Sequence, residues 1–391
     1  MKICILAPRF PFPETGGDVL RMNHIAQYLK EKGHQVVLVS FYESASDLKN
    51  KNTGIYKRIY LVKRSVIISA VHVMKALFSK TPLQCAYYNS DNYLKVFQMV
   101  LQQEKPDLYI AHTGRMVQYL EACSLRKQSI VDLADALSKT YSLVNISSLN
   151  SYKKYVYCIE RKRIQKFEQF LISKYRKVIL VSEADKQFLG NKESLFVHKM
   201  GIPLNKQYPK NYNEGKIVFV GNMRTLQNQD AAVYFAKQIF PKLIKIKPGI
   251  TFHIIGAEPP IRIQKLSDRK SIFVTGFVES IEREIENACL AVAPVRIAAG
   301  IQNKVLISMA NHVPVVLSKT ISLGITELVS GKNCYIAEKD SDYIRYCLRL
   351  LNSERERNLI ADAGYKMVDK YYGWQQVLRG YENMPDESGG K

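Results

Sequence analysis

The feature that most constrains the fold is a pair of strand–glycine–helix openings, which lie about two hundred residues apart. The first runs from the apolar stretch Lys2–Ala7 through Gly16 and Gly17 into a helix. The second begins with the apolar stretch Lys216–Gly221, which also leads into a helix. A buried strand followed by a tight turn and a helix is the start of a βαβ unit, and such units build parallel sheets. The sequence therefore predicts an α/β fold with two doubly wound, Rossmann-like domains that face a central cleft.

The domain boundaries follow from where periodicity is lost. Residues 200–214 are rich in Pro, Asn and Gly and show no helical or strand period, which is typical of a linker. We therefore expect an N-terminal domain at 1–199, a linker at 200–214 and a C-terminal domain at 215–372. Residues 373–391 contain Trp374, the only tryptophan, and are expected to form a crossover helix and tail.

The charge is strongly basic and unevenly distributed. The net charge is +22, and residues 1–200 hold 31 Lys and Arg against 16 Asp and Glu, or +15. Such an excess favours an anionic partner, namely nucleic acid, an anionic membrane or an acidic substrate. The chain has no zinc-finger spacing and no aromatic RNA-binding motif, so we expect no nucleic-acid partner. The apolar, basic-flanked stretch Ser65–Phe78 predicts a helix that lies on an anionic membrane or presents a solvated charged face.

Cysteine and hydropathy patterns indicate the compartment. The seven cysteines are scattered without a C-x-x-C pair, as expected for reduced thiols in a cytoplasmic protein, and they suggest no metal site. No apolar run approaches the roughly eighteen residues of a membrane span. We therefore expect a cytoplasmic protein, with peripheral attachment to the inner face of the membrane as an option.

The stretch Ala298–Ser318 predicts the most informative site. Gly300 opens a helix whose first turn contains Lys304, and a short buried strand follows after Pro314. The free N–H groups of a helix start and its positive dipole end both favour phosphate. An ordinary αβ unit with a capping loop explains the spacing equally well.

Six short motifs occur in the order and spacing of one known family. They are P-x-x-GG at 13–17, the strand that ends at His112, VSEAD at 181–185, VGN at 220–222, VTG at 274–276 and GIQNKVL at 300–306. Together they cover nearly the whole chain, which resembles the retaining glycosyltransferases of family 4 with their two-domain GT-B architecture. The resemblance implies a metal-independent transferase that moves a sugar from a nucleoside-diphosphate sugar to a lipid-linked glycan acceptor in polysaccharide assembly. It implies no cofactor, because the nucleotide-sugar is the donor substrate.

The resemblance also implies roles for particular residues. His112 would lie near the transferred sugar and serve as the catalytic residue. On the acceptor side we expect Asp18, Arg21 and Asp132, although a D-x-x-D pair such as Asp132 and Asp135 also suits metal ligation or helix capping. The expected donor-binding residues are Gly16, Gly17, Arg224, Gly276, Val278, Gly300, Ile301, Gln302 and Lys304.

One departure from the family pattern affects the donor site. The family usually has a carboxylate directly after the Leu of this motif and a second one eight residues earlier. This chain has Ile307 and Ala299 at those positions. Two other functions therefore remain open: a catalytically impaired partner subunit of the same fold, and a nucleotide-sugar epimerase or phosphorylase.

Overall fold

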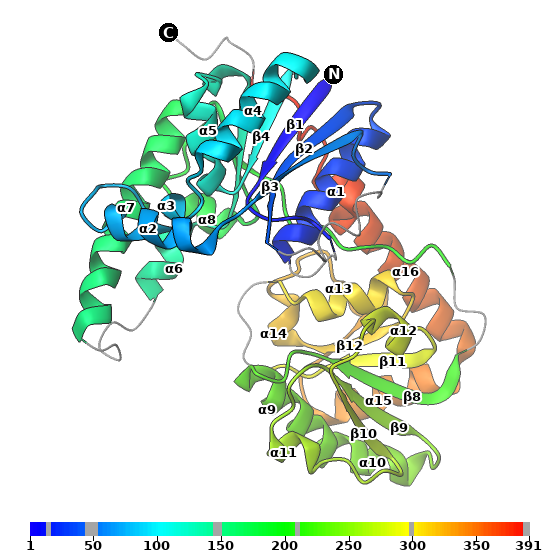
Figure 1. The fold of residues 1–391 in the computed structure, drawn as a ribbon. Coiled ribbons are helices and arrows are strands. Elements are labelled where there is room, and N and C mark those ends of the chain that lie inside the picture. The colour runs from blue at the N-terminus through cyan, green and yellow to red at the C-terminus, as the bar shows by residue number, and fades with distance from the viewer. Residues whose placement is uncertain (13–16, 44–53, 144–150, 208–211, 297–300, 386–391) are drawn as a thin grey trace. The chain divides into compact units, whose positions relative to one another are not determined.

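The computed structural model describes residues 1–12, 17–43, 54–143, 151–207, 212–296 and 301–385. The chain divides into two compact units, each built on one parallel sheet (Figure 1). Unit 1 contains residues 1–200 and the segment from Val377 onwards, and unit 2 contains residues 201–376. The segment expected as a linker, 200–214, thus belongs to unit 2 except for its first residue. The expected crossover segment divides between the units at Val377.

Unit 1 is organised around a seven-stranded parallel sheet with the order β3-β2-β1-β4-β5-β6-β7. Its strands are apolar runs, and Ile3 and Ile5 are as deeply buried as their alternating neighbours Cys4 and Leu6. Since successive side chains point to opposite faces, both faces of the sheet are covered. The strands are β1 (Lys2–Ala7), β2 (Gln35–Tyr42), β3 (Arg58–Lys63), β4 (Leu108–His112), β5 (Ser129–Ala134), β6 (Lys177–Leu180) and β7 (Leu195–Val197).

Helices connect these strands, as parallel pairing requires. Side-chain caps begin several of them; Ser90 Oγ, for example, accepts a hydrogen bond from Tyr93 N at the start of α4. The helices of unit 1 are α1 (Gly17–Glu31), α2 (Val66–Ala76), α3 (Leu83–Tyr87), α4 (Asp91–Glu104), α5 (Val117–Ala122), α6 (Leu137–Leu143), α7 (Ser151–Lys174) and α8 (Glu183–Phe188).

Unit 2 repeats the plan with a six-stranded parallel sheet in the order β10-β9-β8-β11-β12-β13. The prediction of two doubly wound α/β domains is therefore confirmed. The strands are β8 (Asn213–Val220), β9 (Thr251–Ile255), β10 (Ile272–Gly276), β11 (Ala288–Ala293), β12 (Val315–Ser318) and β13 (Tyr335–Ala337).

The helices of unit 2 pack on this sheet around one core. A π-helical turn, Phe235–Ile239, joins the first two of them. The helices are α9 (Leu226–Tyr234), α10 (Phe240–Ile246), α11 (Ile261–Gln264), α12 (Ile281–Ile285), α13 (Asn303–Ala310), α14 (Lys319–Ser322), α15 (Asp340–Asn352), α16 (Glu354–Tyr372) and α17 (Trp374–Val377).

Strand order identifies where ligands should bind in each unit. In unit 1 the order reverses between β1 and β4, and in unit 2 it reverses between β8 and β11. Open α/β sheets bind ligands beyond the carboxyl ends of the strands at such switch points. Both switch points lie where the sequence motifs fall.

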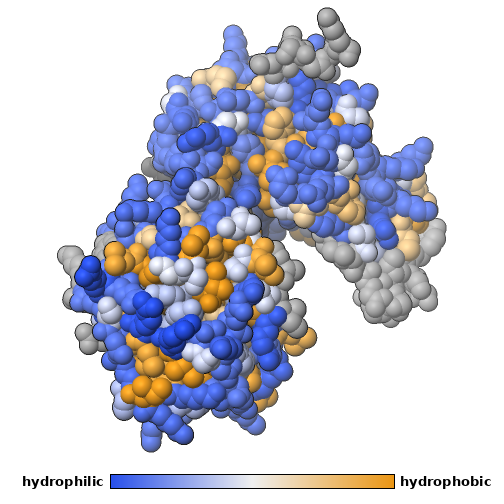
Figure 2. Space-filling model, turned by 180° about the vertical axis from the view of Figure 1, so that it is seen from behind, coloured by the Kyte–Doolittle hydropathy of each residue, from blue (hydrophilic) through white to orange (hydrophobic). Residues whose placement is uncertain are grey.

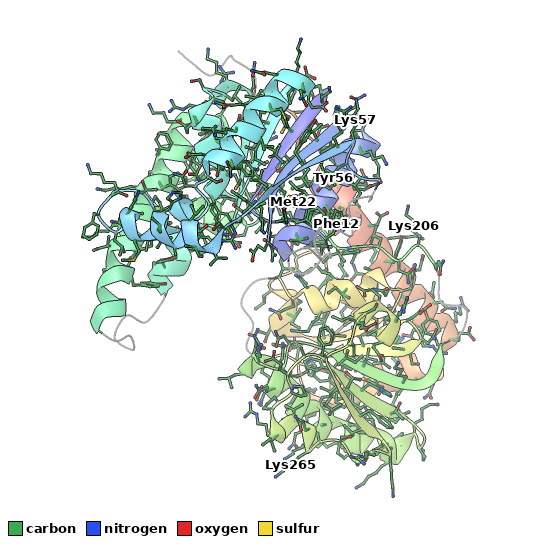
Figure 3. All side chains as sticks on the ribbon, viewed as in Figure 1. Phe12, Met22, Tyr56, Lys57, Lys206 and Lys265 are labelled. Carbon is green, nitrogen blue, oxygen red and sulfur yellow. The ribbon has the colours of Figure 1, made fainter. Side chains whose placement is uncertain are left out.

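The proline-rich segment after β1 is fixed to the first helix. Asn23 Nδ2 donates a hydrogen bond to Pro11 O at 3.0 Å, and the Tyr56 hydroxyl donates to Asn23 Oδ1 at 2.9 Å. The Phe12 and Tyr56 rings meet edge to face, with centroids 6.4 Å apart (Figure 3). The chain is therefore held in place as far as Phe12, and Gly16 lies outside the described residues.

Hydrophilic residues cover much of the surface seen from behind, and apolar residues gather there in patches (Figure 2). Among the described residues, no helix combines the length and apolarity needed to cross a membrane.

Candidate functional site

The switch point of unit 2 brings the start of α13 to the edge of the sheet. Strand β11 ends at Ala293 next to β8, and α13 begins at Asn303 after its N-cap Gln302. Of the four expected donor residues here, Gly300 lies outside the described residues. Ile301 is 39% exposed, whereas Gln302 is buried.

Lys304 is the cation of this helix start. Its Nζ donates a hydrogen bond to Gln302 Oε1 at 2.8 Å, and among the described residues no carboxylate forms an ion pair with it. Burial lowers the pKa of Lys304 to about 8. A half-buried ammonium that has only an amide partner is well suited to bind an anion, because an anion would offset the loss of hydration.

Arg224 follows β8 as expected, but its charge already has a partner. Its guanidinium forms a two-point ion pair with the carboxylate of Glu258, which follows β9. Both side chains are more than half exposed. The expected role of Arg224 in donor binding stays a prediction, and a phosphate that binds Arg224 would have to replace Glu258.

Gly276 and Val278, the two residues expected to contact the donor in the turn after β10, have different surroundings. Gly276 has φ 74°, a left-handed conformation that favours glycine, and a Cβ at this position would meet no atom within 4 Å. It lines an open pocket with Pro259, Gln264 and Thr275. Val278, in contrast, packs against the core of unit 2, and the exposed side chain of the turn is Phe277. Sequence reasoning did not identify Phe277, although an aromatic residue in this turn was visible.

The switch point of unit 1 contains His112 and the start of α1. His112 Nε2 lies 3.0 Å from the carbonyl oxygen of Asp18 and donates a hydrogen bond to it. The Asp18 carboxylate forms an ion pair with Arg9, and Gly17 begins the helix beside it. Burial lowers the pKa of His112, so the imidazole is neutral at pH 7. With the proton on Nε2, the buried Nδ1 is a lone-pair acceptor without a partner in the described structure.

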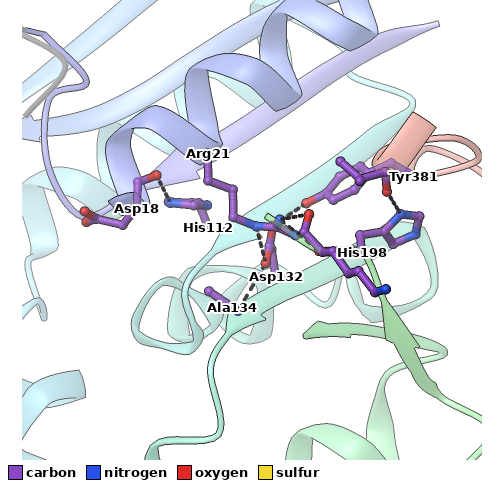
Figure 4. Close-up of polar contacts among 9 residues, drawn as sticks. Asp18, Arg21, His112, Asp132, Ala134, His198 and Tyr381 are labelled. Atoms are coloured by element: carbon purple, nitrogen blue, oxygen red, sulfur yellow. Dashed lines mark hydrogen bonds and ion pairs between the residues drawn. The ribbon is translucent and has the colours of Figure 1, made fainter. Parts of the chain in front are cut away.

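Arg21 and Asp132 form a buried network instead of an exposed acceptor site (Figure 4). The side chains are 1% and 0% exposed, and Arg21 Nε lies 3.0 Å from Asp132 Oδ2. Arg21 Nη1 donates to the His198 carbonyl at 3.0 Å, and the Tyr381 hydroxyl donates to Asp132 Oδ2 at 2.8 Å. Burial opposes the charge of Asp132, but attraction by Arg21 and the hydrogen bonds outweigh it and lower its pKa. We therefore correct both acceptor assignments, because in this structure these residues hold unit 1 together.

A pocket beyond β4 and β5 is the better acceptor candidate in unit 1. It is lined by Asp18, Thr113, Arg115, Ala134 and Asp135, among other residues. Thr113 and Ala134, which follow or end these neighbouring strands, have φ values of 71° and 62°. Positive φ in non-glycine residues is costly and gathers at functional sites. The pocket thus has a strained rim with an exposed carboxylate, Asp135, and a cation, Arg115.

Sequence reasoning named Asp135 only as an alternative and did not name Thr113 or Arg115. Backbone strain leaves no mark in a single sequence, so the D-x-x-D pair was the only signal. Within the described part of the chain, no three His, Cys, Asp or Glu side chains are grouped as metal ligands.

The chain was compared with protein families and with individual known proteins. Residues 214–353 match the family model described as Glycosyl transferases group 1. A 44.6 kDa protein in the cps region of Klebsiella pneumoniae is 22% identical over 399 residues, which cover 96% of this chain and 98% of that protein.

Solved structures share the architecture. TarM has a TM-score of 0.62 at 14% identity and covers 98% of both chains. HepE from Anabaena, solved in complex with UDP, has a TM-score of 0.61 at 12% identity and covers 97% of this chain and 98% of its own. Sucrose-phosphate synthase from Thermosynechococcus elongatus has a TM-score of 0.61 at 12% identity, with 97% of each chain covered. At these identities the likeness concerns the fold.

Proposed function

We propose a specific transfer reaction for this chain, because residues 214–353 match the family model of Glycosyl transferases group 1 and the whole chain has the GT-B fold. The protein transfers a sugar from a nucleoside-diphosphate sugar, held by unit 2, to an oligosaccharide acceptor, held by unit 1. The acceptor is lipid-linked, and the product enters polysaccharide assembly at the inner face of the cytoplasmic membrane. The relative in the cps region and the UDP complex of HepE support this choice of pathway class and donor.

The observation that carries the proposal is Lys304. It stands in the first turn of α13 at the switch point of unit 2, half-buried and without a carboxylate partner in the described structure. A diphosphate placed there gains both the ammonium and the N–H groups of the helix start. The same charges stabilise the diphosphate as it leaves, which is where negative charge develops during sugar transfer.

Arg224, Gly276 and His112 contact the other parts of the donor in this proposal. Arg224 exchanges Glu258 for a phosphate oxygen, and Gly276 leaves room for the base against the turn after β10. A sugar hydroxyl that donates to His112 would have to reach the buried Nδ1 by displacing neighbouring side chains, since the Nε2 proton is bound to the Asp18 carbonyl. No residue is needed as a covalent nucleophile in this scheme, which is a retaining mechanism based on charge stabilisation and independent of metal.

Nucleotide binding tests the donor site directly. UDP and GDP are each titrated in a thermal-shift assay against the wild type, Lys304→Gln and the control Lys245→Gln. Lys245 is an exposed lysine of α10, so the control removes the same charge elsewhere in unit 2. A ligand at a hundred times its Kd stabilises the protein by roughly 2.7 kcal/mol. We expect one nucleotide to stabilise the wild type and the control but not Lys304→Gln; loss of the shift in the control, or no shift with any nucleotide, contradicts the proposal.

A second function rests on the two missing carboxylates. With Ile307 and Ala299 in the expected positions, the chain could bind a nucleotide-sugar weakly and act as a non-catalytic partner of another transferase. Donor hydrolysis and acceptor transfer separate the two, because a partner subunit binds without turnover. An epimerase would convert the donor to a second nucleotide-sugar without acceptor, which product analysis detects.

A further inference from the structure

Helix α2 of unit 1 presents its larger apolar side chains to solvent and buries only two small residues. Its buried residues are Ser69 and Ala76, at 3% and 5% exposure. A surface helix of a soluble protein normally turns its apolar stripe toward the core. Here the exposed residues are Val66 (58%), Ile67 (78%), Ile68 (54%), Val71 (48%) and Met74 (60%), followed by Phe78 (92%).

This outward face is held rigidly by the rest of unit 1. Ser65 Oγ caps the helix by accepting a hydrogen bond from Ile68 N, and His72 Nδ1 lies 3.0 Å from Asn89 O. Arg163 of α7 donates to the carbonyl of Leu77 at 2.8 Å. The helix lies beside α3 and α7 (Figure 1). The apolar face is therefore a fixed surface of the fold and not a frayed segment.

The sequence around the face is rich in cations, and the carboxylates that the structure places nearby, Glu43 and Glu160, are paired with Arg64 and Arg163. Residues 54–90 contain six Lys and Arg and no Asp or Glu. Three of the lysines, Lys63, Lys75 and Lys80, are exposed and have no hydrogen-bond or ion-pair partner among the described residues. Lys63 precedes the helix, Lys75 lies in its last turn, and Lys80 follows it.

We propose that α2 docks this protein on an anionic phospholipid bilayer, with the helix lying in the plane of the interface. Ile67, Ile68, Met74 and Phe78 insert among the acyl chains, while the three lysines bind lipid phosphates. The surface is distinct from the donor and acceptor sites, so the inference does not depend on the transferase reaction. It does place unit 1 at the surface where a lipid-linked acceptor would be found.

The positive charges favour a bilayer over a second copy of this chain as the occupant of the α2 face. A second copy of the chain seated on this face would bring two acid-free, lysine-flanked helices together, and like charges oppose such pairing. A bilayer supplies apolar depth and anionic headgroups at once. An adjoining groove is lined by the cations Lys80, Arg163 and Lys166, by Phe167 and Phe170, and by one carboxylate, Glu121. It shares Phe167 with the acceptor candidate pocket.

Vesicle flotation tests the proposal with the full-length protein. Phosphatidylcholine vesicles with and without phosphatidylglycerol are compared at 0.1 M and 1 M salt, where the screening length falls from about 10 Å to about 3 Å. We expect binding to the anionic vesicles at low salt and at least tenfold weaker binding to neutral vesicles or at high salt.

Two variants separate the apolar contribution to vesicle binding from the electrostatic contribution. Ile67→Ser with Phe78→Ser removes the insertion, and Lys63→Gln with Lys75→Gln and Lys80→Gln removes the charge. Each lysine near an anionic surface is worth about fivefold in affinity, so the triple variant should lose well over tenfold. The control, Phe277→Ser with Leu323→Ser, changes two apolar residues of unit 2 that are 78% and 76% exposed and should bind like the wild type.

The folding and turnover of the α2 variants are monitored separately. All substituted side chains are exposed, so melting temperatures should be unchanged, and hydrolysis of a soluble donor should be retained if the chain is a transferase. Equal binding of the α2 variants and the wild type overturns the proposal. So does equal binding to neutral and anionic vesicles at both salts. A concentration-dependent dimer that disappears with Ile67→Ser would instead assign the face to a second copy of the chain.

Discussion

The hydroxyl of Tyr381 donates a 2.8 Å hydrogen bond to the carboxylate of Asp132, 249 residues earlier in the chain. Both side chains are fully buried. Lys177 reinforces this contact, because its Nζ donates to the carbonyls of Gly380, Tyr381 and Asn383 at 2.8, 2.9 and 2.8 Å. The C-terminal segment is thus an integral part of unit 1, although the intervening chain from 201 to 376 forms unit 2.

Tyr381→Phe should destabilise unit 1 without changing its fold. The variant removes one hydrogen bond to a buried charged group, which is worth about 1.5–3 kcal/mol. Urea unfolding followed by circular dichroism measures the loss. Tyr371→Phe, which changes an exposed tyrosine, is the control and should unfold like the wild type. Equal stability of the two variants would show that the contact with Asp132 contributes nothing.

Arg21→Met should cost more, about 3–5 kcal/mol, because it leaves the Asp132 carboxylate buried without its cation. Adding Asp132→Asn to Arg21→Met removes the uncompensated charge and should recover part of the loss. The same urea experiment reports both. If acceptor binding fell while stability stayed constant, the original assignment of Arg21 to the acceptor site would be restored.

Nucleotide affinity should depend on pH through Lys304. Its pKa is lowered to about 8, so the ammonium is charged below pH 8 and loses its proton above it. If the diphosphate binds only the charged form, Kd rises about tenfold per pH unit above 8. Lys304→Arg keeps its charge throughout and should bind with a flat profile to pH 9.5. Calorimetry at several pH values measures both; matching profiles for the two proteins would exclude Lys304 as the titrating group.

Glu258→Gln should tighten diphosphate binding. The substitution removes the carboxylate that occupies Arg224 and leaves a guanidinium available for phosphate. Arg224→Ala should weaken binding, and the double variant should resemble Arg224→Ala. The control Glu338→Gln releases Lys319 from a similarly exposed ion pair of unit 2 and should have no effect. Weaker binding by Glu258→Gln would indicate that Glu258 itself contacts the ligand.

Ile307→Glu tests how the nucleotide ribose is held. Ile307 is partly buried and packs at the margin of the core of unit 2, on the helix that begins the donor site. A glutamate at this half-exposed position can accept hydrogen bonds from two ribose hydroxyls, and we expect tighter nucleoside diphosphate binding. Calorimetry and urea unfolding are measured together. A loss of several kcal/mol in stability, as expected for a carboxylate forced into the core, would show that the position does not face the ligand.

The sequence by itself determined the architecture and the position of the helix start proposed as the donor site. Short apolar runs such as Lys2–Ala7 and the turn-plus-helix segments after them encode strands and connections locally, so two parallel sheets could be inferred before any contact was known. The helix of Ser65–Phe78 was predicted within two residues at each end, and its basic flanks were equally visible. The start of α13 with Lys304 was also placed correctly, because capping, glycine turns and first-turn charges are all local features.

The roles of charged side chains were decided only by the tertiary structure. Arg21 near the start of α1 and Asp132 near the end of β5 look like site residues in the sequence. In the fold they neutralise each other across 111 residues, and Tyr381 contacts Asp132. Arg224 likewise meets Glu258, and Thr113 and Ala134, at the ends of two neighbouring strands, have positive φ. The free energy of a charge depends on its burial and on the partner within a few ångströms. Those two quantities are set by which distant segments the fold brings together, and no local window of the sequence contains them.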